Sequence, residues 1–279
     1  MLKIAITGST GLIGSRIIEL LKDDFEFIEL IEGQIDITKI DSVWNALKQL
    51  DFDILFHLAA YTNVDGAEQS PGKELAYKIN VEGTKYISDS VWQKRKKLIY
   101  VSTDFVFDGK NPPFYENSKA NPLGYYAQTK FEGENLVNRQ AMIVRFSYPY
   151  RAKHPFKPDF VKRLKNLLEQ KKQTILVTDS LMTPTFIDDI AYTMKYLFNN
   201  FTPDVFHIVG ENSMSPFDSG KIIAKTFRLD KHLISPTTFL EYSKGKALRP
   251  QFSDIRSKKN HFYKMRTFEE GLQEVLKQI

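Results

Sequence analysis

The chain has 279 residues, is 42% hydrophobic, carries a formal charge of +5 and contains no cysteine. It is long enough to bury a full core, as one large domain or as a large domain with a smaller lobe. The absence of cysteine excludes disulfides and thiolate metal sites, and the one dense basic run, 94–97, is expected to be a solvated helix end rather than a nucleic-acid surface. No apolar run is long enough for a membrane span and no signal-peptide pattern is present, so a cytoplasmic protein without membrane partners is expected.

The chain begins with a predicted buried strand, a glycine-rich turn and a helix. Residues 3–6 form a short apolar run, and 15–22 has the apolar spacing of a helix. Between them, Gly8, Gly11 and Gly14 recur at every third position. Because glycine lets the backbone turn tightly and approach a pyrophosphate at a helix N-terminus, the pattern predicts a dinucleotide-binding turn.

A second strand is predicted over 25–31, where a dinucleotide-binding fold carries the residue that contacts the adenosine ribose. Glu29 and Glu32 both lie near the required distance from the turn. Arg16, just after the third glycine, is a candidate for a 2′-phosphate, although a surface arginine on a helix is the simpler interpretation. These residues therefore leave the choice between NAD and NADP open.

The third predicted strand, 53–60, ends in the small residues Leu58, Ala59 and Ala60. A cofactor bound to a parallel sheet passes the carboxyl ends of the strands, so these residues are expected to lie beside it. His57, within the same strand, is interpreted as a packed core histidine.

A further strand, 98–101, leads to Thr103, and Tyr126 and Lys130 follow on a predicted helix. A spacing of four places Tyr126 and Lys130 on one helix face. A phenol has an ordinary pKa of about 10, and a nearby cation favours its ionised form and lowers that pKa. We therefore predict that Tyr126 transfers a proton, that Lys130 lowers the phenol pKa and holds a ribose, and that Thr103 orients the same carbonyl group.

Strands and helices alternate along the first two thirds of the chain, which predicts an α/β fold with a doubly wound parallel sheet (Rossmann) and a smaller C-terminal substrate-binding lobe. Residues 1–150 are expected to form the dinucleotide-binding domain. Residues 151–279 are expected to form mainly the lobe, with about 173–206 returning to the Rossmann domain. The other predicted elements are helices over 43–50, 76–90, 160–172 and 219–227, a helix start at 184–191, and strands over 141–145, 174–179 and 205–209.

The glycine turn, Ser102-Thr103-Asp104 and the Tyr126/Lys130 pair occur in this order, and the combination resembles the extended short-chain dehydrogenase/reductase family. The resemblance implies NADP or NAD as cofactor, with NADPH the first candidate, and catalytic roles for Thr103, Tyr126 and Lys130. Asp36-Ile37 looks like the loop of that family that touches the adenine. The cofactor-binding residues implied are Gly8, Thr10, Gly11, Leu12, Ile13, Gly14, Asp36, Ile37, Leu58, Ala59, Ala60, Asn80, Tyr126 and Lys130.

Within that family, the segment 102–109 resembles the dTDP-4-dehydrorhamnose reductases. Related 4,6-dehydratases carry an Asp-Glu pair after the threonine. Here Phe105 follows Asp104, and the missing glutamate argues against dehydration.

The same resemblance implies that Asp104, Phe105, Tyr148 and Arg249 contact the substrate. Phe105 and Tyr148 replace a tyrosine and a tryptophan of those reductases, which leaves the identity of the sugar open. Arg249 lies in an Arg-Pro segment similar to theirs, and a guanidinium suits a sugar-nucleotide diphosphate. Some relatives bind magnesium between subunits through a glutamate at the position of Arg16, so no metal is predicted.

The resemblance therefore implies NAD(P)H-dependent reduction of the C4 ketone of a nucleotide-linked 4-keto-6-deoxy sugar, with dTDP-4-dehydrorhamnose reduced to dTDP-rhamnose as the first candidate. The expected partners are the nucleotide sugar and, as a further candidate, a second copy of the chain. Three alternatives stay open: a nucleotide-sugar epimerase, a reductase of another nucleotide sugar, and a non-catalytic NADP-binding regulatory subunit of the methionine adenosyltransferase type.

Overall fold

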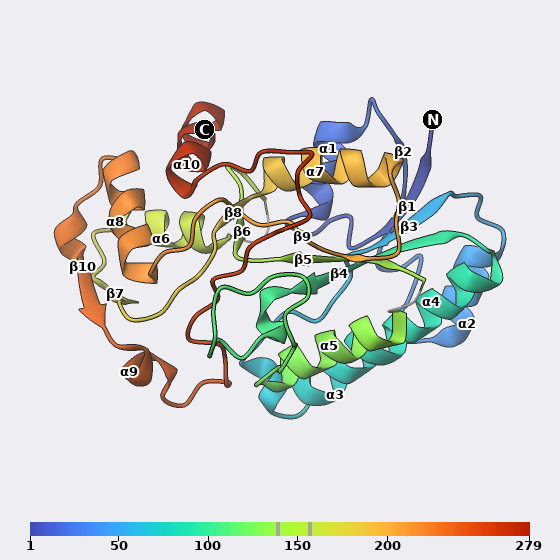
Figure 1. The fold of residues 1–279 in the computed structure, drawn as a ribbon, viewed down its shortest axis with the longest axis horizontal. Helices are drawn as coiled ribbons and strands as arrows, with labels where there is room; N and C mark the ends of the chain where they lie inside the picture. Colours follow the sequence, from blue (N-terminus) through green and yellow to red (C-terminus); the bar gives the residue numbers. More distant parts are fainter. Residues whose placement is uncertain (138–139, 156–157) are drawn as a thin grey trace.

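The computed structural model describes residues 1–137, 140–155 and 158–279, and its centre is a six-stranded sheet (Figure 1). The strand order is β2-β1-β3-β4-β5-β9, and every pairing is parallel. The order reverses between β1 and β3, which makes that point the topological switch of the sheet. The strands are β1 (Lys3–Thr7), β2 (Glu26–Leu30), β3 (Ile54–His57), β4 (Lys97–Thr103), β5 (Met142–Phe146) and β9 (Val205–His207).

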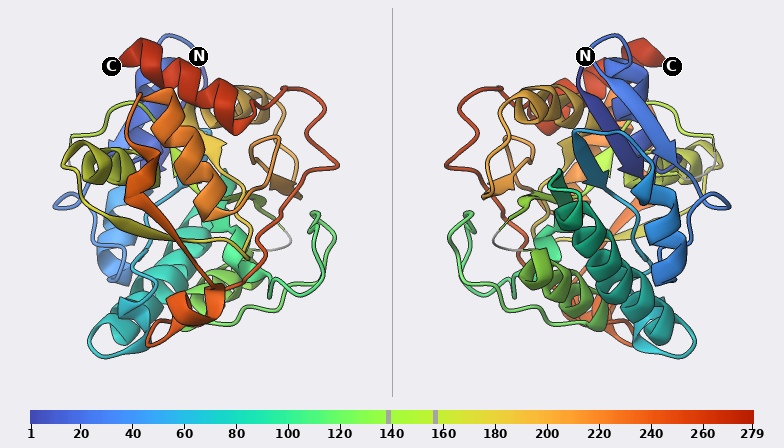
Figure 2. Two further views of the ribbon diagram at one scale, coloured as in Figure 1. Left: turned by 90° about the vertical axis from the view of Figure 1, so that its left-hand side faces the viewer. Right: turned by 90° about the vertical axis from the view of Figure 1, so that its right-hand side faces the viewer.

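Helices cover both faces of this sheet (Figures 1 and 2). On one face lie α1 (Gly14–Leu21) and α7 (Ile187–Asn199), and on the other lie α2 (Ile40–Lys48), α4 (Thr84–Gln93) and α5 (Tyr125–Val137). Because both faces of the sheet are buried, the inner strands β1, β3 and β4 are near-continuous apolar runs, whereas the edge strand β2 has the exposed glutamates Glu26 and Glu29.

The smaller lobe lies at one end of the sheet, at the left of Figure 1. Its core joins Tyr150, Phe186 and Phe268 to apolar side chains of α6 and α8. The strand β7 belongs to this lobe, whereas α7 and β9 belong to the six-stranded sheet and its helical cover. The elements of the lobe are β6 (Pro149–Tyr150), paired with β8 (Thr185–Phe186), β7 (Thr174–Val177), paired with β10 (Ile234–Thr237), and α6 (Phe160–Glu169), α8 (Pro216–Thr226), α9 (Phe239–Ser243) and α10 (Phe268–Gln278).

The predicted fold class is confirmed, and the element bounds differ in two instructive places. The helix expected over 76–90 is longer, because α3 (Gly72–Tyr77) continues through a π-helical turn, η2 (Lys78–Gly83), into α4. The helix expected over 160–172 ends earlier, since Lys171 has a φ of 54°, which a continuing helix does not allow. The described residues also include three short 3-10 helices: η1 (Gly66–Glu68), η3 (Asp104–Val106) and η4 (Lys231–Leu233).

Within the described ranges, we find no helix with the length and apolar character that crossing a bilayer requires.

Candidate active site

The ends of three neighbouring strands place the predicted site residues along one edge of the sheet. Thr7, the last residue of β1, pairs with His57, the last residue of β3, and β4 continues past both to Thr103. This edge contains the switch point between β1 and β3. In open parallel sheets ligands bind at such a point, outside the carboxyl ends of the strands.

The glycine turn between β1 and α1 leaves no space for side chains at two positions. Gly8 has a φ of 72°, and a Cβ there would lie 2.8 Å from the backbone nitrogen of Ala59. A Cβ on Gly14 would lie 2.5 Å from the Gly8 carbonyl oxygen. α1 starts without a side-chain cap, and the buried Ser9 hydroxyl has no hydrogen-bond partner among the described residues. An unpartnered hydroxyl beside a backbone without Cβ atoms, at the N-terminus of a helix, fits the diphosphate of a dinucleotide.

The middle of the turn is exposed and is fastened to the rest of the molecule at its ends. Thr10 and Gly11 face solvent, and the Gly11 amide donates to the Gly8 carbonyl at 3.0 Å. Leu12 and Ile13 pack against the core under α1 and α7. Arg151, from the lobe, donates a hydrogen bond to the Leu12 carbonyl at 3.3 Å. The turn is therefore attached to the lobe as well as to the sheet.

The segment after β3 runs beside the glycine turn. Leu58, Ala59 and Ala60 are partly exposed, and the Ala59 amide donates to Thr7 Oγ1 at 3.2 Å. His57, by contrast, is buried, and burial lowers its pKa to about 3. It is a neutral core histidine that holds Thr7 at 2.7 Å, not a group that exchanges protons with a ligand.

Asn80 connects this segment to the helix that carries the tyrosine. Its side-chain amide donates to the Tyr61 carbonyl at 3.2 Å and to Thr129 Oγ1 at 3.0 Å, and its side-chain oxygen accepts from the Tyr61 amide at 2.9 Å. Asn80 is fully buried and lies in the π-helical turn η2. Single π-helical turns are often found at functional sites, because they point one side chain out of the regular helical register.

Tyr126 and Lys130 lie one turn apart on α5, as their spacing predicts. Tyr126 is partly exposed at the sheet edge, whereas Lys130 is buried. The Lys130 ammonium donates to the Val101 carbonyl at 2.8 Å and lies 4.1 Å from the centre of the Tyr100 ring. These contacts hold the lysine against β4.

Burial has the largest effect on the ionisation of this pair, and it shifts the phenol pKa in the direction opposite to the one expected from Lys130. Burial raises the pKa of Tyr126 to about 12, against a lowering contribution from the Thr103 hydroxyl, and the nearby Asp104 raises it further. Burial also lowers the pKa of Lys130 to about 7. Lys130 is not among the groups that shift the Tyr126 pKa here, so its expected lowering of that pKa stays a prediction. The phenol is therefore protonated at neutral pH and carries the proton that a general acid has to donate, although a pKa this high makes it a weak acid.

The buried lysine should make the stability of the protein depend on pH. Its pKa falls from 10.5 to about 7 on folding, so the unfolded chain binds more protons between these values and stability rises with pH across that window. We expect Lys130→Met to raise the free energy of unfolding at pH 7 by about 2–4 kcal/mol. Urea unfolding from pH 7 to pH 10 measures this difference, which should shrink as pH rises. A constant difference would show that Lys130 is charged throughout the folded protein.

A chain of hydroxyl and carboxylate groups lies next to the phenol. The Thr103 hydroxyl donates to Asp104 at 3.0 Å and accepts from the Phe105 amide at 3.3 Å, and Ser147 donates to the other Asp104 oxygen at 2.8 Å. Asp104 is buried, and burial raises its pKa to about 6. The Thr103 hydroxyl therefore donates its one proton to Asp104, and it would have to rotate to donate a hydrogen bond to any other acceptor.

Aromatic side chains continue from the phenol into the lobe. Ring centres lie 6.2 Å apart for Phe105 and Tyr126, 6.5 Å for Phe105 and Tyr148, and 6.1 Å for Tyr148 and Phe160. Tyr148 borders a hollow of about 270 Å³ between α6, β7 and α9, which Arg249 also lines. The expected substrate contacts Phe105, Tyr148 and Arg249 therefore lie along one path, whereas Asp104 lies buried below it.

Arg249 has partners that its sequence position does not reveal. Its guanidinium forms an ion pair with Asp65, donates to the Ala247 carbonyl at 3.1 Å and lies 5.8 Å from the Tyr242 ring. Asp65 also accepts from the Ala247 amide at 3.0 Å. Arg249 is thus held at the mouth of the hollow by a residue from the segment after β3.

Two residues that were predicted to contact the cofactor, Asp36 and Ile37, contact neighbouring protein residues. The Asp36 carboxylate accepts from the Thr38 amide and hydroxyl and pairs with Lys39 at 3.0 Å, and these contacts lower its pKa to about 2. Ile37 is partly buried, with its carbonyl oxygen beside Gly83. Asp36 therefore stabilises the turn that leads into α2, and its contact with an adenine stays a prediction.

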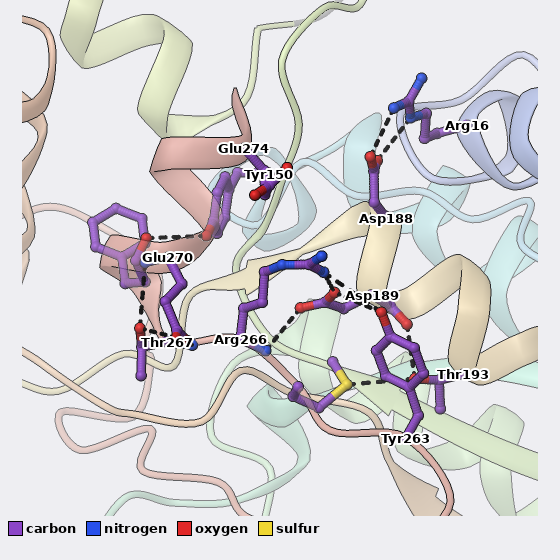
Figure 3. A network of polar contacts seen from close by, with 12 residues as sticks. Arg16, Tyr150, Asp188, Asp189, Thr193, Tyr263, Arg266, Thr267, Glu270 and Glu274 are labelled. Carbon is purple, nitrogen blue, oxygen red and sulfur yellow. Dashed lines mark hydrogen bonds and ion pairs between the residues drawn. The ribbon is translucent and has the colours of Figure 1, made fainter. Parts of the chain in front are cut away.

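Arg16 is paired with Asp188 of α7 (Figure 3). Its Nε and Nη2 atoms each donate to Asp188 of α7 at 2.7 Å, and Nη1 donates to Glu19 at 2.6 Å. Nη2 also reaches Gln278 at 2.9 Å. Across the described ranges, no three or more His, Asp or Glu residues are grouped as a metal ion would require.

The sequence analysis did not identify a buried ionic network behind the pair. Glu134, on the same face of α5 as Tyr126 and Lys130, accepts two hydrogen bonds from Arg145 at 2.8 and 2.6 Å. His207 lies 3.3 Å from Arg145, and its pKa is lowered to about 4 by burial. The spacing of four from Lys130 to Glu134 is a signal that could have identified Glu134.

A doubly wound parallel sheet, a bare glycine turn at its switch point and a Tyr-x-x-x-Lys pair on α5 together define an extended short-chain dehydrogenase/reductase. The chain belongs to the family described as the RmlD substrate binding domain, whose model matches residues 2–279.

Named relatives and solved structures agree with this assignment. A dTDP-4-dehydrorhamnose reductase from Bacillus anthracis str. Ames, solved in complex with NADP, superimposes with a TM-score of 0.91 over 100% of both chains at 28% identity. A dTDP-4-dehydrorhamnose reductase from Aggregatibacter actinomycetemcomitans is 29% identical over 78% of this chain and 76% of its own. The methionine adenosyltransferase 2 subunit beta of Xenopus tropicalis is 26% identical over 84% of this chain and 74% of its own.

Proposed function

We propose that this protein reduces the C4 ketone of a nucleotide-linked 4-keto-6-deoxy sugar with NADH or NADPH, and that dTDP-4-dehydrorhamnose is its substrate. One observation carries the proposal: a protonated, partly exposed phenol at Tyr126 lies between a glycine turn that fits a dinucleotide and an aromatic path that leads to Arg249. The dTDP-4-dehydrorhamnose reductases among its relatives support the choice of substrate.

The reaction needs a hydride, a proton and a fixed carbonyl. A bound nicotinamide supplies the hydride. Tyr126 donates its proton to the ketone oxygen, and Thr103, once turned from Asp104, donates a hydrogen bond to the same oxygen. Lys130, charged when the phenol becomes a phenolate, stabilises that anion from beneath. Gly8, Thr10, Gly11, Leu12, Ile13, Gly14, Asp36, Ile37, Leu58, Ala59, Ala60 and Asn80, with Tyr126 and Lys130, are proposed to line the cofactor.

The substrate is proposed to lie along the path into the lobe. The hollow near Tyr148 takes the nucleotide, and Arg249 binds the diphosphate, for which the guanidinium must exchange Asp65 for phosphate oxygens. Phe105 packs on the apolar side of the sugar ring. In this proposal, residues 1–150 mainly hold the cofactor and 151–279 mainly hold the substrate. A homodimer and a cytoplasmic location are also predictions, which light scattering and cell fractionation would test.

The deciding experiment is a panel of nucleotide-activated 4-keto sugars, incubated with NADH or NADPH and followed at the nicotinamide absorbance. We expect stoichiometric cofactor oxidation with a dTDP-linked 4-keto-6-deoxy sugar and formation of the 4-hydroxy product. An epimerase would interconvert sugars without net oxidation of the added cofactor. The relationship to a methionine adenosyltransferase subunit gives a second candidate, which would be favoured by binding of that synthetase without reduction of any ketone.

A further inference from the structure

The end of β2 determines which charges meet the adenosine ribose of a bound cofactor. β2 pairs with β1 in parallel, with Leu30 opposite Thr7, so the residues after Leu30 lie beside the start of the glycine turn. Ile31 and Glu32 follow there, both exposed. The Ile31 carbonyl accepts from the Gln34 amide at 3.0 Å, so Glu32 lies in a tight turn at the cofactor edge.

The cations near this edge are engaged or distant. Between Gly8 and Lys39 the sequence has three basic residues, Arg16, Lys22 and Lys39. All three guanidinium nitrogens of Arg16 donate to side chains on α1, α7 and α10, and Figure 3 shows the pair with Asp188 of α7. Lys22 caps the far end of α1, and Lys39 pairs with Asp36. Arg16 is therefore engaged, Lys22 lies at the end of α1 away from the glycine turn, and Lys39 would have to leave Asp36 to bind an added phosphate.

Carboxylates dominate the same stretch. Glu29 and Glu32 are both exposed, one within the last residues of β2 and the other directly after it. A 2′-phosphate brings about two further negative charges, whereas the 2′-hydroxyl of NADH can donate a hydrogen bond to a carboxylate. The negative charge at this edge therefore repels the 2′-phosphate of NADPH, whereas it can bind the 2′-hydroxyl of NADH.

We infer that Glu32 makes this protein selective for NADH over NADPH. The inference rests on the proposed nicotinamide site and reverses the preference that the sequence resemblance suggests. Its physical basis is the placement of an exposed carboxylate at the ribose position with Arg16 committed to Asp188.

Titration of the full-length protein with NADH and with NADPH, without any sugar, tests the inference through the fluorescence of the bound nicotinamide. We expect NADH to bind about tenfold or more tightly than NADPH at low ionic strength, with a ratio that narrows as salt is added. Glu32→Arg should reverse or abolish this ratio. Glu26→Arg makes the same charge change at the opposite end of β2 and should leave the ratio near that of the wild type. Arg16→Gln should also leave the ratio unchanged.

Equal or tighter binding of NADPH to the wild type would overturn the inference, as would an unchanged ratio in Glu32→Arg. Selective NADH binding without turnover of any keto sugar would refute the proposed reaction and leave the inference standing. Binding of neither cofactor would refute both.

Discussion

Tyr126→Phe should lower the turnover number by about 10²- to 10⁴-fold, which is the usual contribution of a positioned general acid. The substitution removes the one oxygen that donates the proton and leaves the ring, with its contact to Phe105 at 6.2 Å, in place. Cofactor affinity should change little, because the glycine turn and Asn80 are untouched. Steady-state kinetics together with a cofactor titration separate these two effects.

Tyr125→Phe is the matched control for this variant. Tyr125 is the neighbouring residue on α5, and its ring faces the Lys73 ammonium at 4.8 Å rather than the sheet edge. Its hydroxyl has no part in the proposed reaction, so turnover should stay at the wild-type level. Wild-type turnover in Tyr126→Phe would remove the proposed acid from the mechanism.

Glu134→Gln should destabilise the folded protein by about 3–5 kcal/mol, because it leaves Arg145 buried without its counter-charge. The side chains of Glu134 and Arg145 are only 4% and 5% exposed, and two hydrogen bonds join them. An amide can accept one of these bonds but turns its NH₂ group towards the guanidinium for the other. Such a loss is a large share of the 5–15 kcal/mol of a typical domain, so urea unfolding should show it clearly.

Glu132→Gln makes the same change on the exposed side of α5 and should cost less than about 0.5 kcal/mol. If Glu134→Gln does not fold, the double variant Glu134→Leu with Arg145→Met should restore folding, because two apolar side chains remove both buried charges. A loss under about 1 kcal/mol in Glu134→Gln would show that solvent reaches the pair.

The glycine spacing, the apolar strands and the Tyr126/Lys130 interval determine much of this protein locally. A backbone without Cβ atoms at Gly8 and Gly14, and a face shared by residues four apart, follow from chain geometry alone. For this reason the fold class and the positions of most strands could be predicted from the sequence. The end of the helix predicted over 160–172 could not, because it depends on the left-handed conformation at Lys171.

Only the tertiary structure decides which partners the predicted site residues have and how their pKa values shift. The sequence suggested Arg16 as a phosphate ligand, but its side chain pairs with Asp188, which lies 172 positions away. Arg249 likewise forms an ion pair with Asp65, which lies 184 positions away. Burial raises the pKa of Tyr126 where a neighbouring cation was expected to lower it. Such contacts and the loss of solvent arise when distant segments pack together, so no local pattern encodes them, whereas turns and helix faces are set by residues a few positions apart.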